Sequence, residues 1–77
     1  MVRDDNFKNN KEAGLTDREK EVVKEVVKGK LNKLIASDLG MKENTLESHM
    51  KNIHQKTRTH SKAELVIWAV DNPVELI

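Results

Sequence analysis

One stretch of this chain, residues 32–57, constrains the fold more than any other feature. It contains a short segment with apolar residues, then a glycine, and then a longer segment whose apolar residues recur with the spacing of an α-helix. The apolar positions of the longer segment recur at i, i+4, i+7 and i+11, namely Leu46, Met50, Ile53 and Thr57. Residues at this spacing lie on one face of an α-helix. The stretch therefore predicts two helices joined by a tight turn, the second buried on one side only.

Start and stop signals place the remaining helices. Thr16 with Glu19, and Ser61 with Glu64, have the spacing of a capping box. Asn32 is expected to cap the second helix, with an inward stripe of Leu31, Leu34, Ile35 and Leu39. Because no strand pattern occurs, we predict an all-α, compact four-helix domain with a central helix-turn-helix. The expected helices cover about residues 17–28, 33–39, 43–57 and 62–71.

The chain is short enough for one domain. Residues 1–14 are polar and without period, so we expect a linker or disordered N-terminal tail before a folded domain at 15–77. The absence of cysteine excludes disulfides and thiolate metal sites. With no apolar run approaching the roughly 18 residues of a membrane span and no signal-peptide core, we expect a cytoplasmic protein with no membrane partner.

Charge is unevenly distributed along the chain. Residues 28–62 carry eight Lys/Arg and three acidic residues, a balance of +5, whereas the rest carries six basic and ten acidic residues, a balance of −4. A small domain with a basic side suits nucleic acid, because phosphate neutralisation supplies much of the affinity. On charge alone, a solvated basic surface explains the pattern equally well.

The polar face of the third predicted helix favours the first interpretation. Its side chains have short or forked polar ends that can reach base edges: Asn44, Glu47, Ser48, Lys51 and Gln55. Thr45, Asn52 and Lys56 flank this face, where phosphate oxygens would lie. Any surface helix has a polar side, but this one also follows a tight turn and has small residues near its start. We therefore predict that it enters the major groove of DNA.

Short motifs in one order extend this pattern over most of the chain. They are Leu15-Thr16-Asp17-Arg18-Glu19, Gly29, Asn32-Lys33-Leu34-Ile35-Ala36-Ser37-Asp38-Leu39, Thr45-Leu46-Glu47-Ser48-His49, Ile53-His54-Gln55-Lys56 and Lys62-Ala63-Glu64-Leu65. With these motifs, residues 15–71 resemble the C-terminal DNA-binding domain of LuxR/NarL/FixJ-type bacterial transcription regulators, also known as the GerE family.

The resemblance implies a four-helix response-regulator domain that binds promoter DNA, usually as a dimer, with its third helix in the major groove. The family's base-reading positions carry over to Glu47, Ser48 and Lys51. Its phosphate-contacting positions carry over to Lys33, Thr45, Asn52 and Lys56. Glu19 and His49 match family positions that more often stabilise the fold than read DNA.

Several residues depart from the family pattern. Glu47 stands where a basic or neutral residue is common; we expect it either to accept a hydrogen bond from a cytosine amino group or to be turned aside by Lys51. Thr57 replaces a leucine, so weaker packing is expected at the end of the helix. Lys62 replaces an arginine, and Lys42 replaces a serine cap.

The last predicted helix is apolar around most of its circumference. Leu65 and Ala69 are expected to face the core, which leaves Val66, Ile67 and Val70 as the predicted dimerisation surface. The alternative is that residues 74–77 fold back over this surface. A dimer would present two recognition helices about 34 Å apart and would require an inverted-repeat site.

Other functional classes fit less well. The spacings of His49, His54 and His60 do not stack ligands on one helix face, and no nucleophile–base set is visible, so we expect no metal, no cofactor and no enzymatic activity. The alternative function is a sigma-factor-like or protein-interaction module that acts through RNA polymerase or another partner. A receiver or ligand-binding domain on the N-terminal side is a further expected partner.

Overall fold

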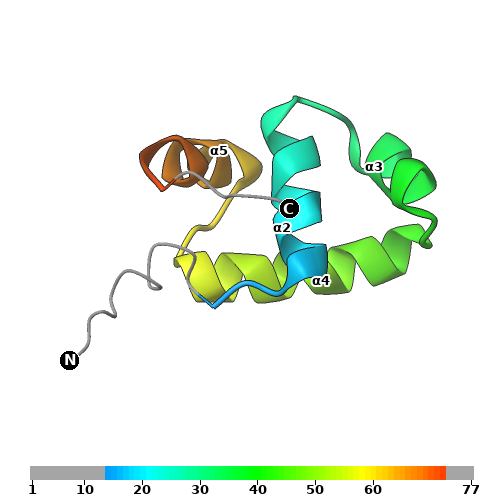
Figure 1. The fold of residues 1–77 in the computed structure, drawn as a ribbon, viewed down its shortest axis with the longest axis horizontal. Coiled ribbons are helices and arrows are strands. Elements are labelled where there is room, and N and C mark those ends of the chain that lie inside the picture. Colours follow the sequence, from blue (N-terminus) through cyan, green and yellow to red (C-terminus); the bar gives the residue numbers. More distant parts are fainter. Residues whose placement is uncertain (1–13, 73–77) are drawn as a thin grey trace.

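The computed structural model describes residues 14–72, and the predicted all-α fold is confirmed there. Helices, labelled as in Figure 1, are α2 (Asp17–Val27), α3 (Asn32–Leu39), α4 (Glu43–Thr57) and α5 (Lys62–Asp71), and this part of the chain contains no strand. The expected helix ends agree to within a residue. The predictions for the N-terminal tail, apart from Gly14, and for the fold-back of residues 74–77 lie outside the described residues.

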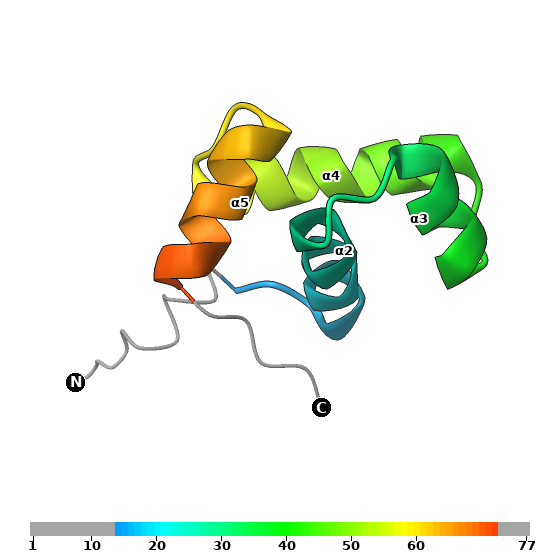
Figure 2. The ribbon, with the colours of Figure 1, turned by 90° about the horizontal axis from the view of Figure 1, so that it is seen from above.

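The longest helix, α4, runs along one edge of the domain, and α2 crosses it (Figure 1). Near the two ends of α4 lie α3 and α5, on opposite sides of α2 (Figure 2). The central helix α2 packs against all three other helices, whereas α3 and α5 do not contact each other within the described residues. As a result, α4 has one side against the domain and one side along its outer edge.

The core explains this placement of α4. Its predicted inward residues, Leu46, Met50, Ile53 and Thr57, are all buried. They meet side chains from the other helices, chiefly Val22, Val23, Val26, Ile35 and Leu65, all at most 2% exposed. Burying one such side chain fully is worth about 1.5–3 kcal/mol. Rotating α4 about its axis would expose several of them at once, so the packing fixes which face of α4 meets solvent.

The starts of α2 and α5 follow the predicted capping by Thr16 and Ser61. Thr16 Oγ1 accepts a hydrogen bond from the Glu19 N–H at 3.1 Å, and Glu19 Oε1 accepts one from the Thr16 N–H at 2.9 Å. Gly40 ends α3 in the left-handed region (φ 69°), where a side chain is disfavoured. The Met41 N–H then donates to the Ala36 carbonyl at 2.9 Å, which sets the tight turn into α4.

The prediction for the inner face of α3 was partly wrong. Leu31 is 69% and Leu34 53% exposed, whereas Ile35 and Ala36 form the buried face. Leu31 precedes the helix in extended backbone (φ −72°, ψ 151°), so it does not follow the helical period that assigned it inward. Leu34 lies about 100° around the axis from Ile35. Asn32 is not the cap either, because the helix begins at Asn32 and Leu31 occupies the N-cap position.

Candidate nucleic-acid interface

The outer side of α4 is polar along its whole length. The residues predicted to face or flank DNA on this helix are exposed, namely Asn44, Thr45, Glu47, Ser48, Lys51, Asn52 and Gln55. Lys33 on α3 is exposed as well. The Ser48 hydroxyl donates to the Asn44 carbonyl one turn earlier, at 3.3 Å, so its lone pairs point away from its own helix backbone. The arrangement offers hydrogen-bonding groups on a convex, accessible surface.

The helix-turn-helix is held against α2 by polar contacts. Arg18 of α2 donates to the Leu39 carbonyl at the end of α3. The Lys30 ammonium lies 2.7 Å from Asp38 Oδ2 on α3 and 2.6 Å from Glu25 Oε1 on α2. Hydrogen bonds to Asp38 and Glu25 raise the pKa of Lys30, and the bond from Lys30 lowers the pKa of Glu25 despite its desolvation. Exposed ion pairs add little stability, so their effect is to orient α3.

Side-chain contacts divide the Lys and Arg residues of positions 28–62 into two groups. The first group has protein partners: Lys28 and Lys30 on Glu25, Lys56 on Glu19, and Lys62 on the Lys30 carbonyl. The second group has no hydrogen bond or ion pair within residues 14–72, and consists of Lys33, Lys42, Lys51 and Arg58. The second group comes from α3, the turn before α4, α4 itself and the residue that follows α4. These are the cations available to a polyanion.

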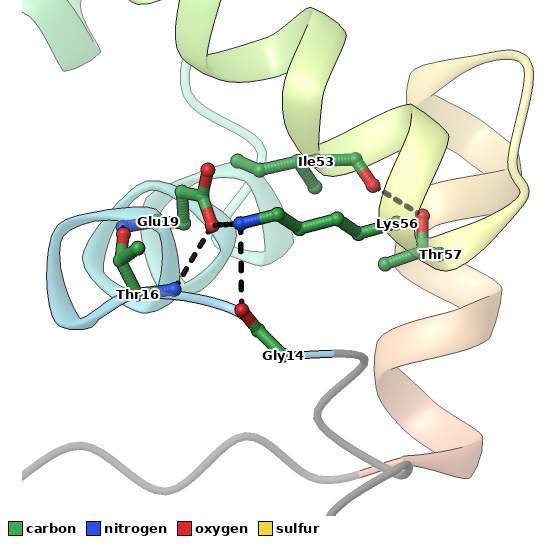
Figure 3. A network of polar contacts seen from close by, with 6 residues as sticks. All are labelled: Gly14, Thr16, Glu19, Ile53, Lys56 and Thr57. Carbon is green, nitrogen blue, oxygen red and sulfur yellow. Dashed lines mark hydrogen bonds and ion pairs between the residues drawn. The ribbon is translucent and has the colours of Figure 1, made fainter.

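Lys56 has a partner inside the domain. Its Nζ lies 2.7 Å from Glu19 Oε1 and 3.4 Å from the Gly14 carbonyl oxygen (Figure 3). Burial on its own would raise the pKa of Glu19, which is 4% exposed. The hydrogen bonds from Lys56 and the Thr16 N–H, with the charges of Lys56 and His49, outweigh burial and hold this pKa below its usual value.

This ion pair joins the last turn of α4 to the first turn of α2. Moving the Lys56 ammonium to a phosphate would leave the Glu19 carboxylate buried with one fewer donor, which is unfavourable. The predicted phosphate contact of Lys56 stays a prediction, but the contacts favour an internal role. They also agree with the expectation that Glu19 and His49 hold the fold.

Beyond Thr57, the chain forms a basic hollow that the sequence did not predict. Arg58 adopts left-handed backbone (φ 59°, ψ 40°) and directs the chain toward α5. The hollow has a volume of about 630 Å³, and its lining residues are Lys51, His54, Gln55, Arg58, Thr59 and His60. By sequence pattern, residues 58–60 form only a short connection between two helices. The available signal was an arginine directly after the last helical residue, where glycine is usual.

The outer face of α5 is apolar. Leu65 and Ala69 are buried as predicted, whereas Ile67 is 63% and Val70 69% exposed, and Val66 is half-buried. This face lies at the opposite end of the domain from α3 (Figure 2). Contiguous exposed apolar side chains commonly mark a protein contact.

Among residues 14–72, His, Asp and Glu side chains form no group that could hold a metal ion. None of the four helices has the length and apolar character needed to cross a bilayer.

Comparison with known proteins gives a family match, "Bacterial regulatory proteins, luxR family", over residues 13–69. The chain is 39% identical over 64 residues to the probable transcriptional regulator ycf29 of Cyanophora paradoxa, covering 83% of this chain and 30% of that protein. It is 35% identical over 66 residues to the CsgBAC operon transcriptional regulatory protein of Escherichia coli, covering 86% and 31%. It is 35% identical over 54 residues to the nitrate/nitrite response regulator protein NarL of Escherichia coli, covering 70% and 25%.

The chain thus spans about 30% of the length of the first two of these relatives. No solved structure matched it.

The Lys56–Glu19 pair yields a stability prediction. Lys56→Met keeps the aliphatic stem and removes the ammonium, so we expect a loss of about 1–3 kcal/mol in the free energy of unfolding at pH 7. Because the pKa of Glu19 is lowered in the folded state, its contribution is complete above the unfolded value of about 4.3 and lost as pH falls through the folded value. Urea unfolding of Lys56→Met should therefore show a weaker acid dependence than that of the wild type.

Glu19→Gln and the double variant complete a mutant cycle. A coupling free energy near zero between the two positions would contradict the ion pair. A Lys56→Met variant of unchanged stability that loses DNA affinity would instead support the phosphate contact.

Proposed function

The chain belongs to the luxR family of bacterial regulatory proteins and is a DNA-binding domain of the transcription-regulator type; we propose that it binds promoter DNA with α4 in the major groove. One observation carries the groove assignment: the core buries Leu46, Met50 and Ile53 and so directs the polar side of α4 outward. A major groove about 12 Å wide admits one α-helix with such a face.

We propose that Glu47, Ser48 and Lys51 read base edges. All three are exposed, Glu47 and Ser48 side by side on one turn of α4 and Lys51 on the next. The Lys51 ammonium can donate to guanine O6 and N7, and the Glu47 carboxylate can accept from cytosine N4. Since the Ser48 hydroxyl proton is engaged with the Asn44 carbonyl, this residue would act as an acceptor for a base amino group.

Phosphate contacts are assigned to residues beside this reading set. Lys33, Thr45 and Asn52 are exposed and have side chains with donor groups. Such contacts position the helix and carry no sequence information directly. Lys56 is left out of the proposed set, because its ammonium already neutralises the buried Glu19 carboxylate.

We propose that the domain binds as a dimer through α5. The exposed Ile67 and Val70, with the half-buried Val66, provide the apolar contact. Two-fold association would place the two α4 helices about 34 Å apart, one turn of DNA, on an inverted repeat.

A second interaction is favoured by the exposed leucines of the α3 region. Leu34 on α3 and Leu31 directly before this helix are both exposed to solvent. Leu31 borders a hollow whose lining also includes Ala63 and Val66 of α5. We propose that they serve a protein contact, such as RNA polymerase or a receiver or ligand-binding domain. The name of NarL as a response regulator is consistent with a receiver domain in the longer relatives.

Lys51→Ala should weaken DNA binding. We expect roughly tenfold lower affinity for a selected duplex, because one donor to base edges is lost. Lys24→Ala is the matched control, since Lys24 is exposed on α2, and its affinity should stay within about twofold. Fluorescence anisotropy at several salt concentrations measures both. If the wild type shows no salt-dependent binding to any duplex, the DNA-binding proposal fails.

Glu47→Ala should change sequence preference rather than overall affinity. We expect the variant to lose its preference for cytosine at one position of the site, since the accepting carboxylate is gone. Selection from a random duplex pool, followed by sequencing, compares the variant with the wild type. An unchanged ranking of bound sequences would remove Glu47 from the reading set.

Replacing both Ile67 and Val70 by Ser should weaken cooperative binding to the two half-sites of an inverted repeat. We expect the affinity for a single half-site to be unchanged. The increase in affinity from a single half-site to an inverted repeat should be roughly tenfold smaller than in the wild type, because the apolar contact between subunits is lost. The control replaces Leu34 by Ser, which removes an exposed apolar residue of α3, the helix at the opposite end of the domain from α5. Equal behaviour of the control and the double variant would argue against an α5 dimer.

A further inference from the structure

Arg58 has a backbone conformation that its side chain disfavours. With φ 59° it is the one non-glycine residue of positive φ among the described residues. Glycine adopts this conformation without a steric penalty, and it is the usual residue directly after a helix that ends in this way. Residues kept in left-handed backbone at a cost persist where the surrounding structure fixes them, and they cluster at functional sites.

A chain of hydrogen bonds fixes the backbone on both sides of Arg58. Thr57 Oγ1 donates to the Ile53 carbonyl at 2.9 Å and lies 2.9 Å from Thr59 Oγ1. Thr59 Oγ1 in turn lies 2.7 Å from His54 Nδ1. Every group is satisfied when His54 Nδ1 donates to Thr59, Thr59 donates to Thr57, and Thr57 donates to the carbonyl. The relay, together with burial of Thr57 and Thr59, holds the left-handed turn whatever side chain stands at 58.

The Arg58 side chain itself makes none of these contacts. It is exposed, and its guanidinium has no hydrogen bond or ion pair with residues 14–72. It borders the basic hollow, whose lining also includes Lys51 and His60 and contains no carboxylate. One carboxylate adjoins this lining: Glu64 Oε1 accepts a hydrogen bond from the His60 N–H at 2.6 Å and lies 3.5 Å from His60 Nδ1. Because that carboxylate is engaged by His60, Lys51 and Arg58 remain as the cations of the hollow open to an anion. The hollow continues the polar face of α4 through Lys51 and Gln55.

The length of α4 places this hollow near a DNA strand. A helix of 15 residues is about 22 Å long, whereas the major groove is about 12 Å wide. A helix of that length lying across the groove extends past its rim at one end or both, and phosphates line the rim. The proposed base contacts Glu47, Ser48 and Lys51 lie within the first nine of the 15 residues of α4, so the C-terminal end, which Arg58 follows, extends toward the sugar–phosphate backbone.

We propose that Arg58 is a DNA phosphate contact, held in strained backbone so that its guanidinium meets a phosphate in the hollow beside Lys51 and His60. The proposal rests on the proposed DNA-binding function and adds a contact outside the recognition helix. Arginine suits this place because its planar fork can bind two phosphate oxygens at once. At position 58 the chain thus has a cation that contacts a DNA phosphate, although glycine would give the more stable turn.

Arg58→Gly tests both parts of this proposal in one variant. The fold is preserved, because glycine prefers the left-handed conformation that Arg58 adopts. We expect the melting temperature to rise by roughly 2–6 °C. At the same time, DNA affinity should fall about 5- to 20-fold, with the slope of log K against log salt smaller by about 1. Arg58→Lys keeps the charge, so its slope should match that of the wild type.

A duplex with single methylphosphonate substitutions identifies the phosphate. Neutralising the contacted phosphate should weaken wild-type binding but leave Arg58→Gly unaffected at that position, whereas other positions weaken both proteins equally. A wild type that binds DNA while Arg58→Gly keeps its affinity and salt slope overturns the Arg58 contact alone. A wild type that binds no duplex overturns the DNA-binding function itself, so the two failures are distinguishable.

Discussion

The rotation of α4 about its own axis is the constraint on which the rest of this structure depends. Leu46 and Ile53 are completely buried and Met50 nearly so, and all lie on one side of the helix. Their packing against α2 and α3 leaves no freedom to turn the helix without exposing apolar surface. The proposed contacts of α4 with bases follow from this, because the same packing decides that the opposite side, with Ser48 and Lys51, meets solvent.

The regularity of the pattern explains how much was predictable. Helix period and capping signals are local, so they located all four helices and the buried face of α4 from the sequence alone. The error at Leu34 concerns a residue whose environment is set by another segment, because this apolar side chain lies beside the face by which α3 packs on the core. The pairing of Lys56 with Glu19, 37 positions earlier, is a second contact that the sequence pattern did not indicate. No local period reports such a contact.

Arg58 shows the same limit in the functional site. From the sequence it belongs to a short connection, and its charge has no periodic context. The conformation becomes informative only when the buried relay through Thr57 and Thr59 is seen to impose it. The replacement of leucine by Thr57, which was expected to weaken packing, instead supplies a hydroxyl to this relay. The departure from the family pattern therefore changes the kind of contact at the end of α4.

The small net charge of +1 is compatible with a strong local field. Acidic residues of α2 neutralise the cations that hold the helices together, as Glu19 does for Lys56 and Glu25 for Lys30. Apart from Lys24 on α2, the cations without a hydrogen bond or ion pair within the described residues come from α3, the turn before α4, α4 itself and its C-terminal end. Because the Debye length is about 8 Å at physiological salt, a phosphate at the α4 surface senses mainly those nearby cations rather than more distant charges. Segregation of paired from unpaired charge, more than net charge, thus equips a nearly neutral domain to bind a polyanion.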